Sequence, residues 1–260
     1  MLLFSVLFLL FVLSHEYEVI ADVPKNIDCS LLPPALWCKN EELATKCKVQ
    51  DACKKYRDGS KGKKLLLTVL YESLCPDCQE FITGDLYNKV YSKFQKYVDI
   101  ELVPYGNAKR HENGTITCQH GDNECKINKH EDCALHFLHQ NDRIPYIYCL
   151  ELKLKQGTDF EKASKACFTK LDVGPHIYDL IHHCELGKKG QKLQLVSADR
   201  TENIFPDKHQ FVPHLLFQNV SLLDAQGSIR DLPLTLCGWI EGEKPDVCGA
   251  IGSRELMRNH

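Results

Sequence analysis

Leu65-Leu66-Leu67-Thr68-Val69-Leu70-Tyr71 and, three residues further on, Cys75-Pro76-Asp77-Cys78 are the stretches of sequence that decide the fold. The first is apolar and partly β-branched, which predicts a buried strand. The second opens a segment in which Ile82, Leu86 and Val90 recur every four residues, which predicts a helix with one apolar face. Pro76 suits the first helical position, so Cys75 falls at the helix N-terminus and Cys78 lies one turn inside. The sequence therefore predicts a dithiol at a strand-to-helix turn, a position that favours a thiolate.

A second apolar segment, near residues 98–104, follows that helix. Strand, helix and strand form a βαβ unit, which supports a parallel sheet and an α/β fold class. A further strand is expected over residues 211–217, and the chain enters it through Pro213. A proline inside a central strand would remove a ladder hydrogen bond, so Pro213 must lie at the start of the strand. That position permits a cis peptide bond, although local sequence alone favours trans.

The chain divides into parts of different composition. Residues 1–21 are expected to be a signal peptide, because their apolar run of about a dozen residues is too short to span a membrane. Residues 22–62 form a small cysteine-rich segment that ends in a polar linker, with Cys29, Cys38, Cys47 and Cys53. Residues 63–250 form the main domain, and residues 251–260 are a C-terminal tail. Within the main domain, residues 118–186 read as a helical insertion stapled by disulfides, with six cysteines: Cys118, Cys125, Cys133, Cys149, Cys167 and Cys184.

Composition points to the secretory pathway. The fourteen cysteines are spread along the chain, as in proteins of oxidising compartments. Asn113 and Asn219 each begin an Asn-X-Ser/Thr tripeptide and are candidate glycosylation sites. The net charge of −3 gives no reason to expect nucleic acid or an anionic membrane surface as a partner. No segment after residue 21 is apolar enough to predict a membrane span.

One motif resembles the signature of a known family. Cys118-Gln119-His120-Gly121-Asp122-Asn123-Glu124-Cys125-Lys126-Ile127-Asn128, followed by Cys133, is similar to the signature of the gamma-interferon-inducible lysosomal thiol reductase family. Segments 103–108 and 244–248 resemble other parts of that family. The region around Cys38 and Cys53 resembles the saposin-A-type segment that some invertebrate members carry.

The resemblance implies a thioredoxin-like fold with a helical insertion. It also implies reduction of protein disulfides in acidic endosomes and lysosomes, without a metal or nucleotide cofactor. Such an activity would serve protein unfolding for degradation, antigen processing or innate immunity, and secretion is a further possible destination. The redox pair maps onto Cys75 and Cys78, and the proline that faces the pair maps onto Pro213.

Thiolate chemistry then gives a mechanism. Cys75 attacks a substrate disulfide, and Cys78 resolves the mixed disulfide. A small thiol reductant would restore the dithiol. An unperturbed thiol is only roughly 0.03 per cent ionised at pH 5, and lowering its pKa by about three units needs about 4 kcal/mol. A helix terminus supplies about 0.3 to 2 kcal/mol. We therefore expect hydrogen bonds to the thiolate from Cys78 or backbone N–H groups, and we expect the Asp77 carboxylate to oppose it.

Other interpretations remain open from the sequence. Cys118, His120, Cys125, His130 and Cys133 could hold zinc, although disulfides are the stronger expectation in an oxidising lumen. His120 is expected to be structural and to bind a backbone carbonyl. The protein could instead be an inactive, secreted, disulfide-rich binding protein, or a disulfide oxidase or isomerase of the secretory pathway. It could be a monomer or a disulfide-linked homodimer.

Overall fold

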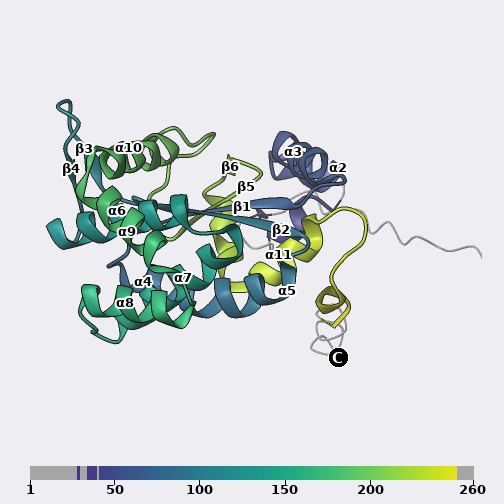
Figure 1. The fold of residues 1–260 in the computed structure, drawn as a ribbon. Coiled ribbons are helices and arrows are strands. Elements are labelled where there is room, and N and C mark those ends of the chain that lie inside the picture. The colour runs from purple at the N-terminus through teal and green to yellow at the C-terminus, as the bar shows by residue number, and fades with distance from the viewer. Residues whose placement is uncertain (1–27, 30–33, 40, 251–260) are drawn as a thin grey trace, which may run out of the picture.

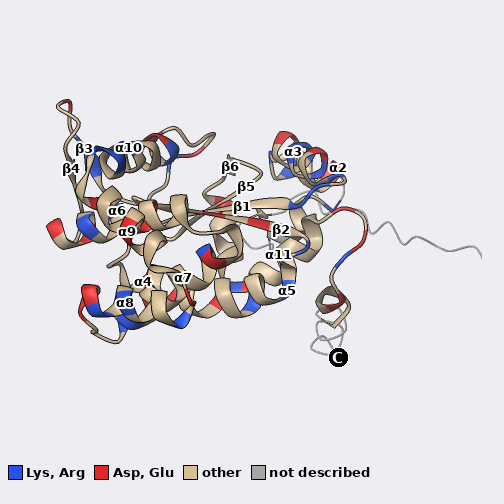
Figure 2. Cartoon of the chain, viewed as in Figure 1, with Lys and Arg blue, Asp and Glu red and all other residues tan. Residues whose placement is uncertain are grey.

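A computed structural model of the chain describes residues 28–29, 34–39 and 41–250 (Figure 1). The expected signal peptide and C-terminal tail lie outside the described residues. No helix among the described residues is both long and apolar enough to cross a membrane. Lys and Arg alternate with Asp and Glu over the helices in the view of Figure 2, which agrees with the small net charge.

A four-stranded sheet forms the centre of the molecule, in the order β2-β1-β5-β6. Strand β1 (Leu65–Tyr71) pairs in parallel with β2 (Val98–Pro104) and antiparallel with β5 (His214–Phe217), and β5 pairs antiparallel with β6 (Val220–Ser221). A βαβ unit extended by an antiparallel pair is the thioredoxin-like arrangement, so the predicted fold class is confirmed. The strand expected over residues 211–217 is shorter, because it begins at His214 and Pro213 lies directly before it.

The connection between β1 and β2 is helical from Pro76 to Phe94. It consists of α4 (Pro76–Phe81), the π-helical segment η2 (Ile82–Tyr91) and α5 (Ser92–Phe94). Ile82, Leu86 and Val90 are buried, so the predicted apolar face is confirmed. These residues belong to the same core cluster as most buried side chains of β1, which fixes the position of the helix that carries the dithiol.

Five helices separate β2 from β5, after a short hairpin of β3 (Lys109–Arg110) and β4 (Ile116–Thr117). They are α6 (Asp122–Phe137), α7 (Gln140–Lys155), α8 (Phe160–Lys170), α9 (Pro175–Leu186) and α10 (Lys188–Glu202). The helical part thus continues past residue 186 to Glu202. Cys133–Cys184 ties α6 to α9, and Cys149–Cys167 ties α7 to α8. The predicted stapling of a helical insertion by disulfides is confirmed.

The N-terminal cysteine-rich segment packs on the main core. It contains α1 (Pro34–Trp37), α2 (Glu41–Lys46) and α3 (Gln50–Ser60), and its disulfides are Cys29–Cys47 and Cys38–Cys53. Tyr56 of α3 stacks on Trp239 of α11 (Leu232–Trp239), with ring centroids 4.5 Å apart, and meets Phe217 of β5 edge-on.

After β6, the 3₁₀ helix η3 (Asp224–Asp231) leads into α11, and the Cys237–Cys248 disulfide links the end of α11 to the segment that follows it.

Two carboxyl groups are buried between the sheet and the insertion. Glu131 of α6 and Glu151 of α7 have no exposed surface. Burial raises the pKa of both groups, and the charge of Glu131 raises the pKa of Glu151 further. Tyr71 of β1 also faces Glu131, and no lysine or arginine is among the causes of these shifts. The folded protein therefore favours the neutral form of both carboxyl groups.

We predict that the protein is more stable in acid than at neutral pH. A carboxyl group whose pKa is raised on folding contributes stability below its unfolded pKa of about 4.3, and that contribution is lost as pH rises through the folded pKa. The melting temperature, measured by calorimetry, should be several degrees higher at pH 5 than at pH 8.

A double Glu131→Gln, Glu151→Gln variant should show a smaller difference between the two pH values, because glutamine does not titrate. Glu112→Gln, at an exposed position, is the matched control and should behave as the wild type. Equal melting temperatures at pH 5 and pH 8 in the wild type would contradict the assignment of neutral, buried carboxyl groups.

Candidate active site

The dithiol lies at the turn between β1 and α4 and in the first turn of α4. Cys75 is the N-cap residue of α4, Pro76 occupies the first turn, and the backbone N–H of Gln79 donates to the Cys75 carbonyl at 3.0 Å. Cys75 is 8% exposed and Cys78 has no exposed surface. Twelve of the fourteen cysteines form six disulfides, and these two are the remaining free thiols. The structure thus places the predicted pair at the predicted strand-to-helix turn.

The surroundings of Cys75 favour its thiolate. The hydrogen bond from the Cys78 side chain lowers the pKa of Cys75 most, burial opposes it, and the backbone N–H groups of Cys78 and Asp77 lower it further, to about 6. The charge of Asp77 acts in the opposite direction. These are the hydrogen bonds and the opposing carboxylate that the sequence predicts. At pH 5, a thiol with a pKa of about 6 is roughly one-tenth ionised, compared with roughly 0.03 per cent for an unperturbed thiol.

Cys78 is the opposite case. Burial raises its pKa well above the ordinary value, and the hydrogen bond to Cys75 and the charge of Cys75 raise it further. The two cysteines therefore differ in chemistry. Cys75 is the thiol that ionises more readily, and Cys78 stays protonated while Cys75 is a thiolate.

The chain comes close to the dithiol at Val212 and Pro213, directly before β5. The Val212–Pro213 peptide bond is cis, and the Val212 carbonyl oxygen lies 4.0 Å from Cys75 Sγ. Beside the pair is a hollow of about 300 Å³ that combines acidic and apolar side chains. Its lining includes Asp77, Glu80, Phe81, Asp85, Phe211, Val212, Pro213 and Ile229. A substrate chain entering this hollow would reach Cys75 next to Val212 and Pro213.

Glu72 is a component of the site that the sequence analysis missed. It follows β1 directly, has no exposed surface, and accepts a hydrogen bond from the backbone N–H of Asn107. Burial raises its pKa, the hydrogen bond from Asn107 opposes the rise, and the charges of Glu124 and Cys75 add to it, giving a pKa of about 7. Its position three residues before Cys75 was the available signal, but an acidic residue at a strand end is ordinarily exposed.

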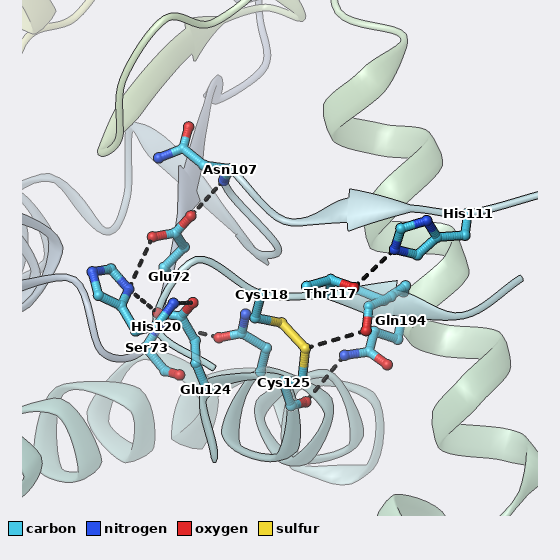
Figure 3. Close-up of a disulfide and its surroundings, with 12 residues drawn as sticks. Glu72, Ser73, Asn107, His111, Thr117, Cys118, His120, Glu124, Cys125 and Gln194 are labelled. Carbon is cyan, nitrogen blue, oxygen red and sulfur yellow. Dashed lines mark hydrogen bonds and ion pairs between the residues drawn. A yellow bond between two sulfur atoms is a disulfide. The ribbon is translucent and has the colours of Figure 1, made fainter. Parts of the chain in front are cut away.

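The loop closed by the Cys118–Cys125 disulfide approaches the same turn (Figure 3). His120 Nδ1 lies 2.6 Å from Glu124 Oε2 and 3.5 Å from Glu72 Oε2. The sequence-based expectation that His120 binds a backbone carbonyl is therefore wrong, because its ring contacts two carboxylates. These three side chains are the one group among the described residues whose metal-ligand atoms lie within 4.8 Å of one another. Since His120 and Glu124 already satisfy each other, we assign the group to internal hydrogen bonding.

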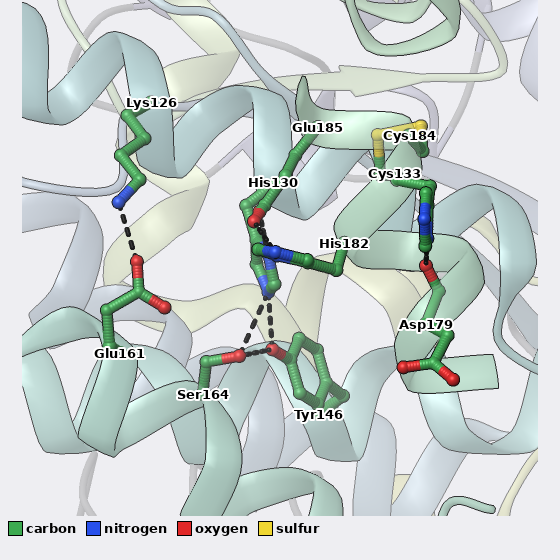
Figure 4. A network of polar contacts seen from close by, with 11 residues as sticks. Lys126, His130, Cys133, Tyr146, Glu161, Ser164, Asp179, His182, Cys184 and Glu185 are labelled. Carbon is green, nitrogen blue, oxygen red and sulfur yellow. Dashed lines mark hydrogen bonds and ion pairs between the residues drawn. A yellow bond between two sulfur atoms is a disulfide. The ribbon is translucent and has the colours of Figure 1, made fainter. Parts of the chain in front are cut away.

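The zinc interpretation of this region is excluded by the partners that its residues have. Cys118, Cys125 and Cys133 are all in disulfides. His130 belongs to a separate buried network, in which both ring nitrogens have partners (Figure 4). Its Nδ1 faces Glu185 Oε2 at 2.5 Å and its Nε2 faces the Tyr146 hydroxyl at 2.6 Å. The network connects α6, α7 and α9 and stabilises the insertion.

The two candidate glycosylation sites are both exposed and both lie in turns of hairpins. Asn113 lies between β3 and β4, where its Oδ1 accepts the Thr115 hydroxyl at 2.7 Å. Asn219 lies between β5 and β6, and its Oδ1 accepts a hydrogen bond from Arg200. Because both side chains are exposed, each position has solvent beside it for a bulky sugar.

Comparison with known proteins gives one family. Residues 66–171 match the family model "Gamma interferon inducible lysosomal thiol reductase (GILT)". The chain is 33% identical to a gamma-interferon-inducible lysosomal thiol reductase of Carassius auratus over 84% of this chain and 83% of that protein. It is 35% identical to a gamma-interferon-responsive lysosomal thiol protein of Arabidopsis thaliana, over 74% of this chain and 79% of that protein.

Among solved structures, the oxidoreductase DsbA from Xylella fastidiosa aligns with a TM-score of 0.43 at 12% identity, covering 66% of this chain and 84% of that chain. The fold assignment rests on the sheet topology described above.

We predict that Cys75 reacts with iodoacetamide in a pH-dependent way with a midpoint at about 6. Cys78→Ala removes the hydrogen bond and should raise that midpoint by at least about one unit. Cys78→Ser retains a hydroxyl donor and should raise it less, which makes it the matched control. The measurement is the rate of alkylation from pH 4.5 to pH 9, followed by mass spectrometry. An unchanged midpoint in Cys78→Ala would refute the role of Cys78 as the principal donor.

We further predict that Asp77→Asn lowers the pKa of Cys75, because the charge of Asp77 raises it. Alkylation at pH 5 should become about two- to fivefold faster, and the rate at pH 8.5 should not change, because the thiol is fully ionised there in both proteins. A slower reaction at pH 5 would mean that Asp77 supports the thiolate instead of opposing it.

Proposed function

The chain belongs to the gamma-interferon-inducible lysosomal thiol reductase family and is a thiol:disulfide oxidoreductase, and we propose that it reduces disulfide bonds of protein substrates in acidic endosomes or lysosomes. The observation that carries this proposal is the pairing of an ionisable thiol, Cys75, with a buried, protonated thiol, Cys78. A reductase needs both kinds of thiol, because a thiolate must attack the substrate disulfide and a second thiol must later resolve the mixed disulfide.

The reaction follows in two displacements. The Cys75 thiolate attacks one sulfur of a substrate disulfide, so that a Cys75–substrate disulfide forms and the other substrate sulfur leaves as a thiolate. Cys78 then gives its proton to the substrate thiolate that has left and attacks Cys75 Sγ, which releases the second substrate thiolate and leaves Cys75 bonded to Cys78. Two equivalents of a small thiol reductant restore the dithiol by the same kind of exchange and leave as their own disulfide.

Substrate positioning is supported by the residues opposite the dithiol. Val212 and Pro213 border the hollow beside Cys75, and the Val212 carbonyl points towards the nucleophilic sulfur. An extended substrate segment lying there would place its disulfide against Cys75. Exposed Phe211, which is 46% accessible, offers apolar contact at the rim.

An acidic compartment is supported by the state of the buried acids. The raised pKa values of Glu131 and Glu151 favour a core that is most stable in acid. Exposure of Asn113 and Asn219 supports glycosylation in the secretory pathway, and six disulfides support an oxidising place of folding.

A second candidate function is disulfide oxidation or isomerisation. The observation that favours it is the lowered pKa of Cys75, because a stabilised thiolate makes the reduced form of a dithiol more stable and its disulfide a better oxidant. The reduction potential of the Cys75–Cys78 pair separates the two functions. A potential near about −120 mV would favour the oxidase, and one near about −200 mV or below would favour the reductase.

We predict that Cys75→Ser abolishes reduction of a disulfide-bonded protein at pH 4.5 to 5.5, with a loss of at least about 100-fold, because no other free thiol is ionised there. Release of substrate thiols is the measured quantity. The matched control is Ser73→Ala, which removes the hydroxyl of a small residue two positions before Cys75 and should retain most of the activity. If the wild type is no faster than Cys75→Ser, the protein is not a reductase under these conditions.

A further inference from the structure

The Cys118–Cys125 loop makes direct contact with the turn that carries the dithiol (Figure 3). The backbone N–H of Ser73 donates to Asn128 Oδ1 at 3.0 Å. His120 faces Glu72 Oε2 at 3.5 Å, and Glu124 receives both the backbone N–H and the ring of His120. Residues of the signature motif thus contact two of the three residues between β1 and Cys75.

The backbone around Gly106 also packs closely against Glu72. Gly106 has φ +56°, and a Cβ placed there would lie 2.4 Å from Glu72 Cγ. A larger residue would displace Glu72, so the 105–107 backbone closes over this carboxyl group. Asn107 also donates from its side chain to Gln119 Oε1 at 2.6 Å. Glu72 and His120 are therefore held in one relative position.

The charges that face Cys75 come from several elements. Asp77 and Cys78 lie on its own helix, Glu72 lies at the end of β1, His120 lies in the signature loop, and Glu151 approaches from α7. Glu151 is neutral in the folded protein because burial raises its pKa. Among these described residues, His120 is the one whose side chain can carry a positive charge.

His120 favours its protonated form. Burial lowers its pKa, but the hydrogen bond to Glu124 and the charges of Glu124, Glu72 and Cys75 outweigh burial and raise it. Interaction between two sites is reciprocal, so a Cys75 thiolate that stabilises the His120 cation is stabilised by that cation to the same extent. Glu72, with a pKa of about 7, is neutral in acid and then adds no opposing charge.

We propose that His120 is a positioning residue of the redox site, held by Glu124 and the Cys118–Cys125 disulfide so that its cation sustains the Cys75 thiolate in acid. The proposal gives the signature motif around Cys118 and Cys125 a role in the reactivity of Cys75. The proposal rests on the proposed thiol reductase activity. As pH falls, His120 gains its positive charge and Glu72 loses its negative charge. Both changes favour ionised Cys75 in the pH range where an ordinary thiol is least ionised.

The test is the rate at which iodoacetamide alkylates Cys75 in the full-length protein, measured from pH 4.5 to pH 8. His120→Gln should slow alkylation about three- to tenfold at pH 5 and leave it unchanged at pH 8, where the thiol is ionised without help. Glu72→Gln should stay within about twofold of the wild type at pH 5, because Glu72 is already neutral there. His111→Gln, in the exposed hairpin, is the matched control and should behave as the wild type.

His120→Lys keeps a positive charge and should restore at least half of the pH 5 rate that His120→Gln loses. A purely structural role would slow alkylation equally at pH 5 and pH 8, and this result, like an unchanged rate at pH 5 in His120→Gln, overturns the proposal. Circular dichroism shows whether His120→Gln folds. If it does not, His120→Lys decides the question: an alkylation rate equal to that of the wild type at pH 5 supports the proposal. A slower rate than the wild type at both pH 5 and pH 8 opposes it. Alkylation needs no substrate, so the proposal can fail while disulfide reduction by the wild type still succeeds.

Discussion

The hydrogen bond from Cys78 to the Cys75 thiolate is the interaction on which the chemistry depends. It is the largest influence that lowers the pKa of Cys75, and it exists because one turn of α4 places the two sulfurs on the same side of the helix. The same bond and the burial of Cys78 keep the second thiol protonated. A single local geometry therefore shifts the pKa values of two identical side chains in opposite directions.

The rest of the fold holds that geometry in place. Strand β1 is central in the sheet and almost wholly buried, so the turn that follows it has little freedom. The buried apolar face of η2 holds the helix that begins at Cys75 against the core. The insertion contributes Asn128, which binds the backbone of the turn between β1 and α4, and the loop closed by the Cys118–Cys125 disulfide. Disulfides within the insertion limit the unfolded ensemble of a segment that supplies residues to the site.

The sequence was sufficient for the parts of the structure that local pattern controls. The β1 strand, the helix after Cys75 and the strand after Pro213 follow from apolar periodicity and proline chemistry, and all three occur where predicted. The participation of Glu72 and its contact with His120 were not predictable in this way. Both depend on segments 35 or more residues along the chain from Glu72 folding back on the turn, and spacing along the chain does not encode that approach. The disulfide pairing was hidden for the same reason, since Cys133 and Cys184 are 51 residues apart.

The most direct test of this account is to trap the first intermediate. A Cys78→Ser protein incubated at pH 5 with a disulfide-bonded protein should accumulate a covalent mixed disulfide, which peptide mapping by mass spectrometry should locate at Cys75. The missing resolving thiol leaves that intermediate without its normal exit. Accumulation of no adduct, or of an adduct at another cysteine, would contradict the assignment of Cys75 as the nucleophile.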